Sequence, residues 1–168
     1  MKKVIFLGLG YIGLPTAAIA AHHGYEVVGV DVNPSVVETV NQGKVHIVEP
    51  DLDKVVKESV LNGHLRAVIQ PEPADAFFIV VPTPFKQNHR ADITYVEAAT
   101  RSVVPYLQPG NLFVIESTSP VFTTERMADL IYRLRPELKG KIYIAYCPER
   151  VLPGNTLYEL VHNDRVIG

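Results

Sequence analysis

The sequence has no tryptophan and a single cysteine, and its charges nearly cancel. Because Cys147 stands alone, an internal disulfide is excluded, and a reduced, cytoplasmic setting fits this composition. Sixteen basic and 18 acidic residues give a net charge of −2, without a basic stripe of the kind that binds nucleic acid or a membrane surface. No apolar run approaches the ~20 residues that a membrane span requires. We therefore expect no nucleic-acid partner and no membrane.

The remaining composition is that of an ordinary globular domain. Of the 168 residues, 47% are hydrophobic and 20% are charged, which is too apolar for a disordered chain. This length corresponds to about one domain, whose core can bury roughly 70% of the surface of the unfolded chain. Lys2 and Lys3 before the apolar Val4–Leu7 could also open a signal peptide. Regularly spaced glycines break that apolar stretch, so a buried first strand is the favoured interpretation.

Short apolar segments alternate with segments of helical periodicity along the chain. The clearest of them, Ala76–Val81 (AFFIVV), predicts a buried strand. Such alternation predicts parallel pairing, and right-handed crossovers then give an α/β, doubly wound sheet with helices on both faces. The expected strands are Val4–Leu7, Glu26–Asp31, Ala67–Ile69, Ala76–Val81, Leu112–Glu116, Lys141–Ala145 and Arg165–Ile167. The expected helices are Tyr11–His23, Pro34–Gln42, Asp51–Leu61, Thr94–Leu107 and Thr124–Arg135.

A glycine motif follows the first predicted strand. Gly8, Gly10 and Gly13 form G-x-G-x-x-G between a strand and a helix, an arrangement that binds the pyrophosphate of a dinucleotide. Asp31 ends the second predicted strand, where an acidic side chain binds the adenosine ribose in Rossmann folds. Its charge, and the lack of an arginine directly after it, favour NAD over NADP. The alternative is an ordinary turn followed by a solvated aspartate, but the combined pattern favours an NAD site.

Three later segments, together with the glycine motif, resemble the UDP-glucose/GDP-mannose dehydrogenase family over the whole chain. They are Val81–Pro84 (VPTP), Glu116–Pro120 (ESTSP) and Cys147–Arg150 (CPER), and each lies at the end of a predicted strand. Longer stretches, among them Gly8–Thr16 (GLGYIGLPT) and Ile144–Gly154 (IAYCPERVLPG), show the strongest resemblance to the family's bacterial UDP-N-acetyl-D-mannosamine dehydrogenases.

The resemblance implies an activity and a domain organisation. The family oxidises the C6 alcohol of a nucleotide sugar to a carboxylate in two NAD-dependent steps, without a metal, through a thioester on a cysteine. For this chain it implies oxidation of UDP-N-acetyl-D-mannosamine to UDP-N-acetyl-D-mannosaminuronate for polysaccharide biosynthesis, in a homodimeric parent. Residues 1–168 are then the NAD-binding Rossmann domain, without the family's central helical and C-terminal UDP-sugar-binding domains. We expect this fragment to be inactive alone.

The resemblance also assigns roles by position. It implies that Glu149 is a general base and that Thr118 helps to order a water beside the reacting carbon. Arg150 and Val151 would contact the UDP-sugar. Glu149 could instead form a structural salt bridge with a neighbouring arginine, and Thr124 could simply cap a helix. No metal ligands are implied, and the implied cofactor contacts are Gly8, Gly10, Tyr11, Ile12, Gly13, Asp31, Thr83, Thr118 and Thr124.

The chain departs from the family pattern at three places. The UDP-glucose members usually read P-E-F-L-x-E-G, whereas here Arg150 replaces the aromatic residue and Pro153 the second glutamate, which favours an N-acetylhexosamine. Many members have G-T-T where this chain has a phenylalanine, Phe122, before its two threonines. Cys147 does not match the family nucleophile, whose G-G-H-C-type motif is missing. A UDP-N-acetylglucosamine or UDP-glucose 6-dehydrogenase, or a free-standing NAD-binding module, remains an alternative.

Overall fold

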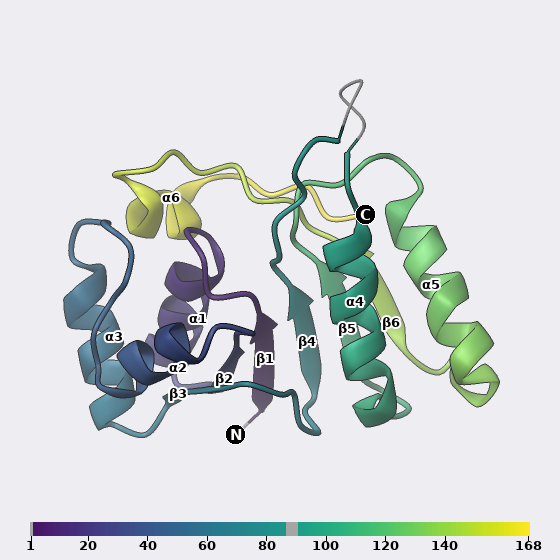
Figure 1. Ribbon diagram of the computed structural model, residues 1–168, viewed down its shortest axis with the longest axis horizontal. Helices are drawn as coiled ribbons and strands as arrows, with labels where there is room; N and C mark the ends of the chain where they lie inside the picture. The colour runs from purple at the N-terminus through teal and green to yellow at the C-terminus, as the bar shows by residue number, and fades with distance from the viewer. Residues whose placement is uncertain (1, 87–90) are drawn as a thin grey trace.

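Parallel strands form the centre of this computed structural model, which describes residues 2–86 and 91–168. Within those residues every strand pair is parallel, and the order across the sheet is β3-β2-β1-β4-β5-β6. The carboxyl ends of the strands point upward in Figure 1. The strands are β1 (Lys3–Leu7), β2 (Glu26–Val30), β3 (Leu65–Val68), β4 (Ala76–Ile79), β5 (Leu112–Ile115) and β6 (Tyr143–Tyr146).

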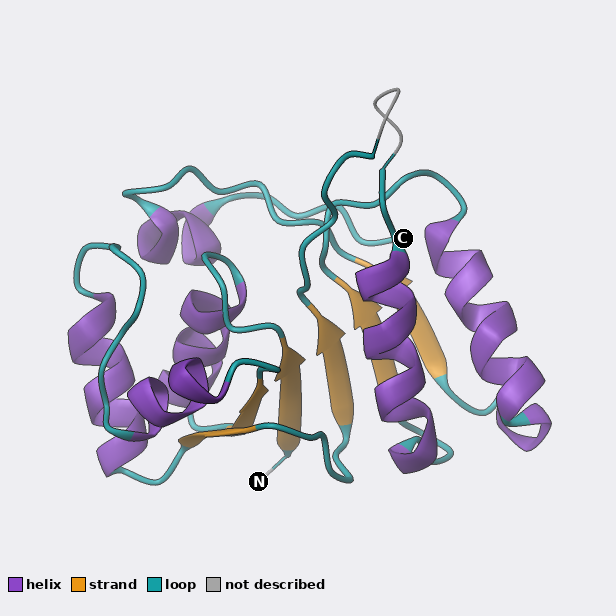
Figure 2. Ribbon diagram, in the orientation of Figure 1, coloured by secondary structure: helices purple, strands orange, loops and turns teal. Residues whose placement is uncertain are grey.

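Helices cover both faces of the sheet, as Figure 2 shows. One face carries α1 (Gly13–His22), α2 (Pro34–Asn41) and α3 (Leu52–Leu61), and the other carries α4 (Thr94–Val103) and α5 (Thr123–Leu134). The short 3₁₀ helices η2 (Val104–Tyr106) and η3 (Pro136–Leu138) lie on the second face, and α6 (Thr156–His162) follows the last strand. The predicted α/β doubly wound fold is therefore confirmed.

Two hydrophobic cores lie on opposite faces of the sheet, because successive side chains of a strand point in opposite directions. Ile5 of β1 and Phe77 of β4 are fully buried in the core beneath α4 and α5, where Met127 packs with them. Phe6, the next residue of β1, belongs instead to the core beneath α1 and packs with Leu14. The strands are apolar on both faces, which is why they appear as continuous hydrophobic runs in the sequence.

Two elements near the end of the chain differ from the sequence expectation. The predicted strand Arg165–Ile167 is wrong, since these residues take no regular secondary structure. Gly168, the residue after this segment, exchanges a pair of backbone hydrogen bonds with Tyr146 of β6, with N···O distances of 2.6 and 2.9 Å. Helix α6 was not expected, because its seven residues are too few to show a clear apolar periodicity.

Helix α6 is held by a carboxylate from a distant part of the chain. Glu49 is buried and accepts hydrogen bonds from the backbone amides of Gly154 (2.9 Å) and Thr156 (2.6 Å). The first amides of a helix have no partner within it, and a negative charge is favourable there. Helix α6 also packs against α1. The loop between β6 and α6 consequently crosses above the carboxyl ends of the strands (Figure 1).

Replacing Glu49 with glutamine tests this attachment. In Glu49→Gln an NH₂ group replaces one acceptor oxygen and faces a backbone amide, so the free energy of unfolding in urea should fall by about 1–3 kcal/mol. Hydrogen exchange should accelerate most at Gly154 and Thr156. As a control, Glu38→Gln removes an exposed carboxylate of α2 and should change stability by less than ~0.5 kcal/mol. Equal effects of the two substitutions would contradict the role of Glu49.

Candidate functional site

The chain connections diverge at the middle of the sheet, between β1 and β4. The helix after β1 packs on one face and the helix after β4 on the other, which opens a crevice at the carboxyl ends of these strands, where doubly wound folds bind ligands. Gly8 has φ +97°, and a Cβ there would lie 2.4 Å from the carbonyl oxygen of Val80. Only glycine therefore lets the loop after β1 pass this close to the end of β4.

The other two glycines of the motif have different roles. A Cβ at Gly13 would lie 1.9 Å from the carbonyl oxygen of Gly8, so this position needs glycine for packing. A Cβ at Gly10, in contrast, would meet no atom of the described residues within 4 Å. Within the same residues, no side chain caps the start of α1, which follows Ile12. Open space beside Gly10 and the amides at an uncapped helix start fit the pyrophosphate of a dinucleotide.

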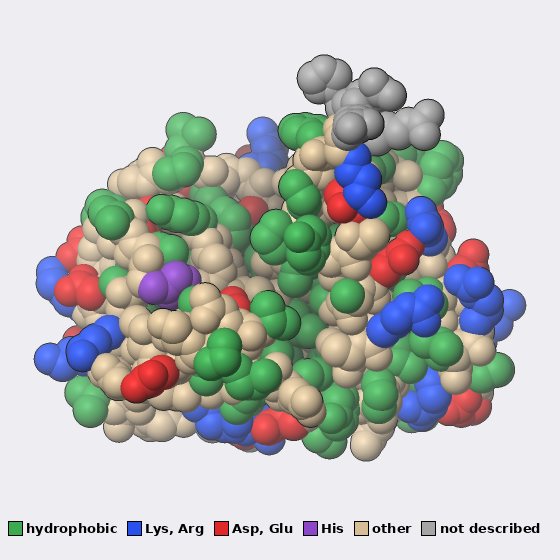
Figure 3. Space-filling model, viewed as in Figure 1, with side chains coloured by type: hydrophobic (Ala, Val, Ile, Leu, Met, Phe, Trp, Pro, Cys, Tyr) green, Lys and Arg blue, Asp and Glu red, His purple; other side chains and the backbone are tan. Residues whose placement is uncertain are grey.

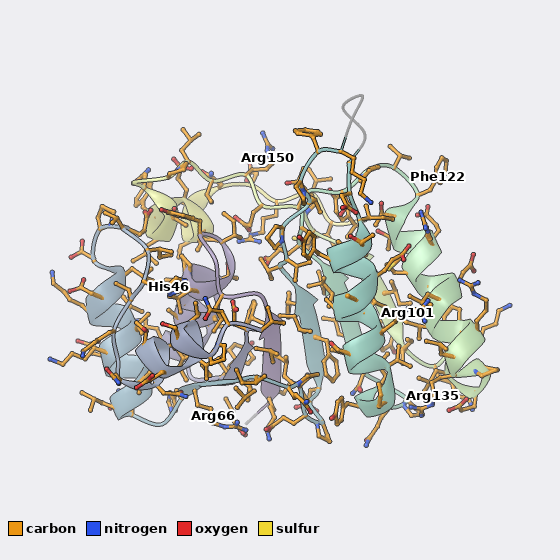
Figure 4. All side chains as sticks on the ribbon, in the orientation of Figure 1. His46, Arg66, Arg101, Phe122, Arg135 and Arg150 are labelled. Carbon is orange, nitrogen blue, oxygen red and sulfur yellow. The ribbon has the colours of Figure 1, made fainter. Side chains whose placement is uncertain are left out.

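Asp31 joins the ends of β1 and β2. Its Oδ2 accepts a hydrogen bond from the backbone amide of Leu9 (3.0 Å), and its Oδ1 accepts one from the amide of Asn33 (2.9 Å). Each carboxylate oxygen retains a further acceptor site, which fits the hydroxyls of a ribose. Arg66 of β3 lies at the other end of the strands, away from their carboxyl ends, as Figure 4 shows. Its charge is thus remote from the position where a 2′-phosphate would sit.

The loops after β4 and β5 are tied to one another. The hydroxyl of Thr83 donates a hydrogen bond to the carbonyl oxygen of Thr118 (2.6 Å), and the hydroxyl of Ser117 donates to the carbonyl oxygen of Val81 (2.8 Å). The structure therefore brings Thr83 and Thr118 together, although they lie 35 residues apart. The side chain of Thr118 is exposed. The cofactor and water contacts expected of these residues stay predictions.

Helix α5 begins with an unusual cap. Phe122 occupies the N-cap in the left-handed conformation, with φ +69°, and no side chain of the described residues caps the helix. Many family members have a glycine here, and Phe122 adopts the left-handed conformation that glycine adopts easily. For a residue with a side chain this conformation costs about 1–2 kcal/mol. The ring is 73% exposed and lies at the carboxyl edge (Figure 4). Thr124 sits in the first turn and is not the cap, contrary to the alternative considered for it.

The loop after β6 contributes a buried carboxylate to an ion pair with the segment after α6. Glu149, whose side chain is 7% exposed, contacts the guanidinium of Arg165, and the same group donates a hydrogen bond to Glu116 (3.3 Å). The structural salt bridge considered for Glu149 is thus present, and its role as a base stays a prediction. Burial raises the pKa of Glu149, while Arg165 opposes the shift. Burial and the charge of Glu149 raise the pKa of Glu116 to about 7, against the pull of Arg165.

Sequence reasoning assigned no role to Glu116 or Arg165. An acidic residue directly after an apolar strand was a usable signal for Glu116, because such positions line the crevice. For Arg165 no local signal exists, since its partners lie 49 and 16 residues away in the chain. Cys147, which directly follows β6, is buried as expected, and its sulfur lies 3.8 Å from the Arg165 guanidinium. That it is not the family nucleophile stays a prediction.

Arg150 and Val151 lie on the segment that runs from β6 to α6. Arg150 is exposed at the carboxyl edge, as Figure 4 shows, and Val151 is half-buried. Asn163 donates a side-chain hydrogen bond to the carbonyl oxygen of Arg150 (2.9 Å), and Glu159 of α6 accepts one from the amide of Leu152 (2.8 Å). The backbone beside both residues is therefore fixed by α6 and the segment after it.

The surface of the protein is unevenly charged. In Figure 3 charged side chains gather over the outer helices, whereas the middle of this face is mostly hydrophobic or uncharged. Over residues 2–86 and 91–168, no helix has the length and apolar character needed to cross a membrane. Nor does this part of the chain bring together three histidine, cysteine or acidic side chains in a group that could hold a metal ion.

Comparison with known proteins identifies the family. The sequence profile described as "UDP-glucose/GDP-mannose dehydrogenase family, NAD binding domain" matches residues 2–168. The chain belongs to the UDP-glucose/GDP-mannose dehydrogenase family. It is the NAD-binding domain of that family, and its cofactor is NAD. That the glycine loop and Asp31 bind this cofactor stays a prediction.

Individual relatives cover nearly the whole chain. It is 56% identical to the UDP-N-acetyl-D-mannosamine dehydrogenase of Yersinia pestis, over 99% of this chain and 42% of the relative. It is 53% identical to the NDP-N-acetyl-D-galactosaminuronic acid dehydrogenase of Ralstonia nicotianae, over 99% of this chain and 41% of that relative. The solved structure of the UDP-D-ManNAc dehydrogenase of Pyrococcus horikoshii superposes with a TM-score of 0.95 at 42% identity. The match covers 99% of this chain and 40% of that structure's chain. The chain thus spans about two fifths of the length of these relatives.

Two alanine substitutions separate the roles of the glycines. Gly13→Ala forces the backbone of the glycine loop apart and should lower the free energy of unfolding by about 1–3 kcal/mol or more. Gly10→Ala should leave that free energy nearly unchanged and weaken NAD binding by about tenfold, because the methyl group enters the space of the pyrophosphate. Urea unfolding and calorimetric titration with NAD measure the two effects. Full NAD affinity in Gly10→Ala would refute the proposed pyrophosphate position.

Proposed function

We propose that this chain is the cofactor domain of a UDP-sugar 6-dehydrogenase that oxidises UDP-N-acetyl-D-mannosamine to UDP-N-acetyl-D-mannosaminuronate. One observation carries the proposal. The loops that hold the family motifs, after β4, β5 and β6, gather at the same edge as the glycine loop and are tied together by hydrogen bonds and an ion pair. The 56% identity to an enzyme of this name supports the choice of substrate.

The cofactor would lie along the carboxyl edge from β2 to β5. The backbone of Gly8–Ile12 and the start of α1 would hold the pyrophosphate, and Asp31 the adenosine ribose. Thr83 and Thr124, in the loop after β4 and the first turn of α5, would hydrogen-bond the rest of the molecule. When bound, NAD accepts the hydride that leaves the sugar carbon. The chain's own part is to orient that acceptor and to exclude a 2′-phosphate.

Groups after β5 and β6 would serve the reacting end of the substrate. Thr118, exposed beside Thr83, would order a water, and Glu149 would take a proton from that water or from the alcohol. A carboxylate whose pKa is raised by burial is a stronger base than an exposed one, which suits this role near neutral pH. Arg150 would meet the anionic nucleotide by charge, and Val151 would contact it mainly through its backbone.

The parent protein would supply the remaining groups. Relatives are more than twice as long as this chain, so we infer that the central helical and C-terminal domains complete the sugar pocket and carry the nucleophilic cysteine. The buried Cys147 does not fit that role. A homodimeric parent and a cytoplasmic location follow from the family resemblance and the composition, and both stay predictions.

The role of Asp31 is tested by calorimetric titration with both dinucleotides. Asp31→Ala should weaken NAD binding by about tenfold and reduce the preference for NAD over NADP, because the acceptor for the ribose hydroxyls and the charge that repels a 2′-phosphate are both lost. Asp53→Ala, on the exposed side of α3, is the control and should bind as the unaltered chain does. Since Asp31 also accepts the amide of Leu9, hydrogen exchange at Leu9 reports any loosening of the loop. Unchanged NAD affinity would disprove the ribose contact.

The substrate is tested with the full-length parent. We expect oxidation of UDP-N-acetyl-D-mannosamine in preference to UDP-N-acetylglucosamine, UDP-N-acetylgalactosamine and UDP-glucose, followed by NADH absorbance. Two NADH molecules should form for each uronate, because converting an alcohol to an acid removes two hydrides. Residues 1–168 alone should bind NAD and oxidise none of these sugars. Preference for another sugar, or steady NADH formation by the fragment, would overturn the corresponding part of the proposal.

A further inference from the structure

Three charged side chains from separate parts of the chain meet beneath the loop that follows β6. Glu116 directly follows β5, Glu149 lies in the loop after β6, and Arg165 lies in the segment after α6. One guanidinium nitrogen of Arg165 contacts Oε1 of Glu149 and lies 3.3 Å from Oε1 of Glu116. The side chains are 2% exposed for Glu116 and 7% for Glu149, against 30% for Arg165. Two buried carboxylates therefore share this guanidinium.

This cluster carries a net negative charge whenever both carboxylates are ionised. A buried charge without full compensation is unfavourable, so one of the two carboxylates retains a proton to a higher pH than an exposed carboxyl would. Glu116 is the better site for that proton. Its side chain is the more deeply buried, and its Oε2 has no hydrogen-bond partner and no charged partner among the described residues, whereas Oε1 of Glu149 lies in direct contact with Arg165.

Among residues 2–86 and 91–168, no basic side chain other than Arg165 forms an ion pair with either carboxylate. Arg165 also donates a hydrogen bond to the carbonyl oxygen of Leu160 in α6 (3.4 Å) and lies 3.8 Å from the sulfur of Cys147. Both contacts are made by the same guanidinium, and neither Leu160 nor Cys147 adds a positive charge. Glu116 and Glu149 thus compete for one partner, and a change in the charge of either shifts the pKa of the other.

We propose that Glu116 is a positioning residue that acts through Arg165 on Glu149, because Arg165 can pair fully with Glu149 only while Glu116 is protonated. This inference rests on the proposed function, in which Glu149 is the base. When Glu116 ionises, it attracts the Arg165 guanidinium, which weakens the pairing of Arg165 with Glu149. The new charge also repels the Glu149 carboxylate, so Glu149 binds a proton more strongly. The pKa of Glu116, raised to about 7 by burial and by Glu149, places this change near neutral pH.

The coupling is measured directly in residues 1–168 labelled with ¹³C at the glutamate carboxyls. The Glu149 resonance should show a second inflection at the midpoint of the Glu116 titration, since interacting sites titrate as a pair. In Glu116→Gln, which keeps the shape and removes the charge, that inflection should disappear. In Glu149→Gln the pKa of Glu116 should fall by about half a unit or more, because its repulsive neighbour is gone. Arg165→Gln should raise the pKa of both carboxyls.

A matched substitution outside the cluster tests whether the loss of any carboxylate alters these titrations. Glu137→Gln removes an exposed carboxylate of η3 beside Arg135, at the edge of the sheet opposite the cluster (Figure 4), and should leave both titrations unchanged. The unaltered chain alone decides the question if a cluster variant does not fold. Single, independent inflections for Glu116 and Glu149 in the unaltered chain would overturn the inference.

The full-length parent separates this inference from the proposed function. In Glu116→Gln the inflection near neutral pH in the profile of kcat should disappear while turnover remains, whereas a merely structural role would lower kcat by one factor at every pH. That uniform decrease would count against the inference. A parent that oxidises no UDP-sugar would refute the proposed function and leave the measured coupling of the carboxyls intact.

Discussion

The close approach of the glycine loop to the end of β4 is the constraint on which the site depends. Gly8 passes the carbonyl of Val80 at a distance that leaves no room for a Cβ, and Gly13 packs onto Gly8 in the same way. These contacts set the start of α1 at the point where the sheet changes its direction of winding. The amides of that helix then face the crevice between β1 and β4, where an anionic group is favourable.

The rest of the carboxyl edge is assembled around this point by polar contacts. Thr83 joins the loops after β4 and β5, Arg165 joins those after β5 and β6, and Glu49 holds α6 so that the last loop crosses the edge. The contacts of Glu49, Glu116 and Glu149 bury a carboxylate, which is unfavourable unless it is paired. Glu116, one oxygen of which has no hydrogen-bond partner among the described residues, is also the buried acid whose pKa is raised to about 7. The altered acidity of Glu116 therefore originates in its burial beside a second carboxylate.

Local chemistry made much of this predictable. The first six predicted strands, Asn33 as the cap of α2, and the tight turn of the glycine motif each depend on residues that are close together in the sequence, and the structure confirms them. The boundaries were less certain: the helix expected over Thr94–Leu107 ends at Val103, where a 3₁₀ turn containing Pro105 follows. Proline lacks the amide that an α-helix would require there.

Periodicity and glycine spacing act over a few residues, and they were enough to predict the doubly wound sheet, the NAD cofactor and the family of the protein. The folded chain alone reveals that Glu149 contacts Arg165, that Glu116 shares this guanidinium and that Glu49 binds the start of α6 across 107 residues. It also reveals that Phe122 takes a left-handed conformation. Such contacts depend on which distant segments the fold brings together, and no local pattern encodes the distance between two side chains that far apart.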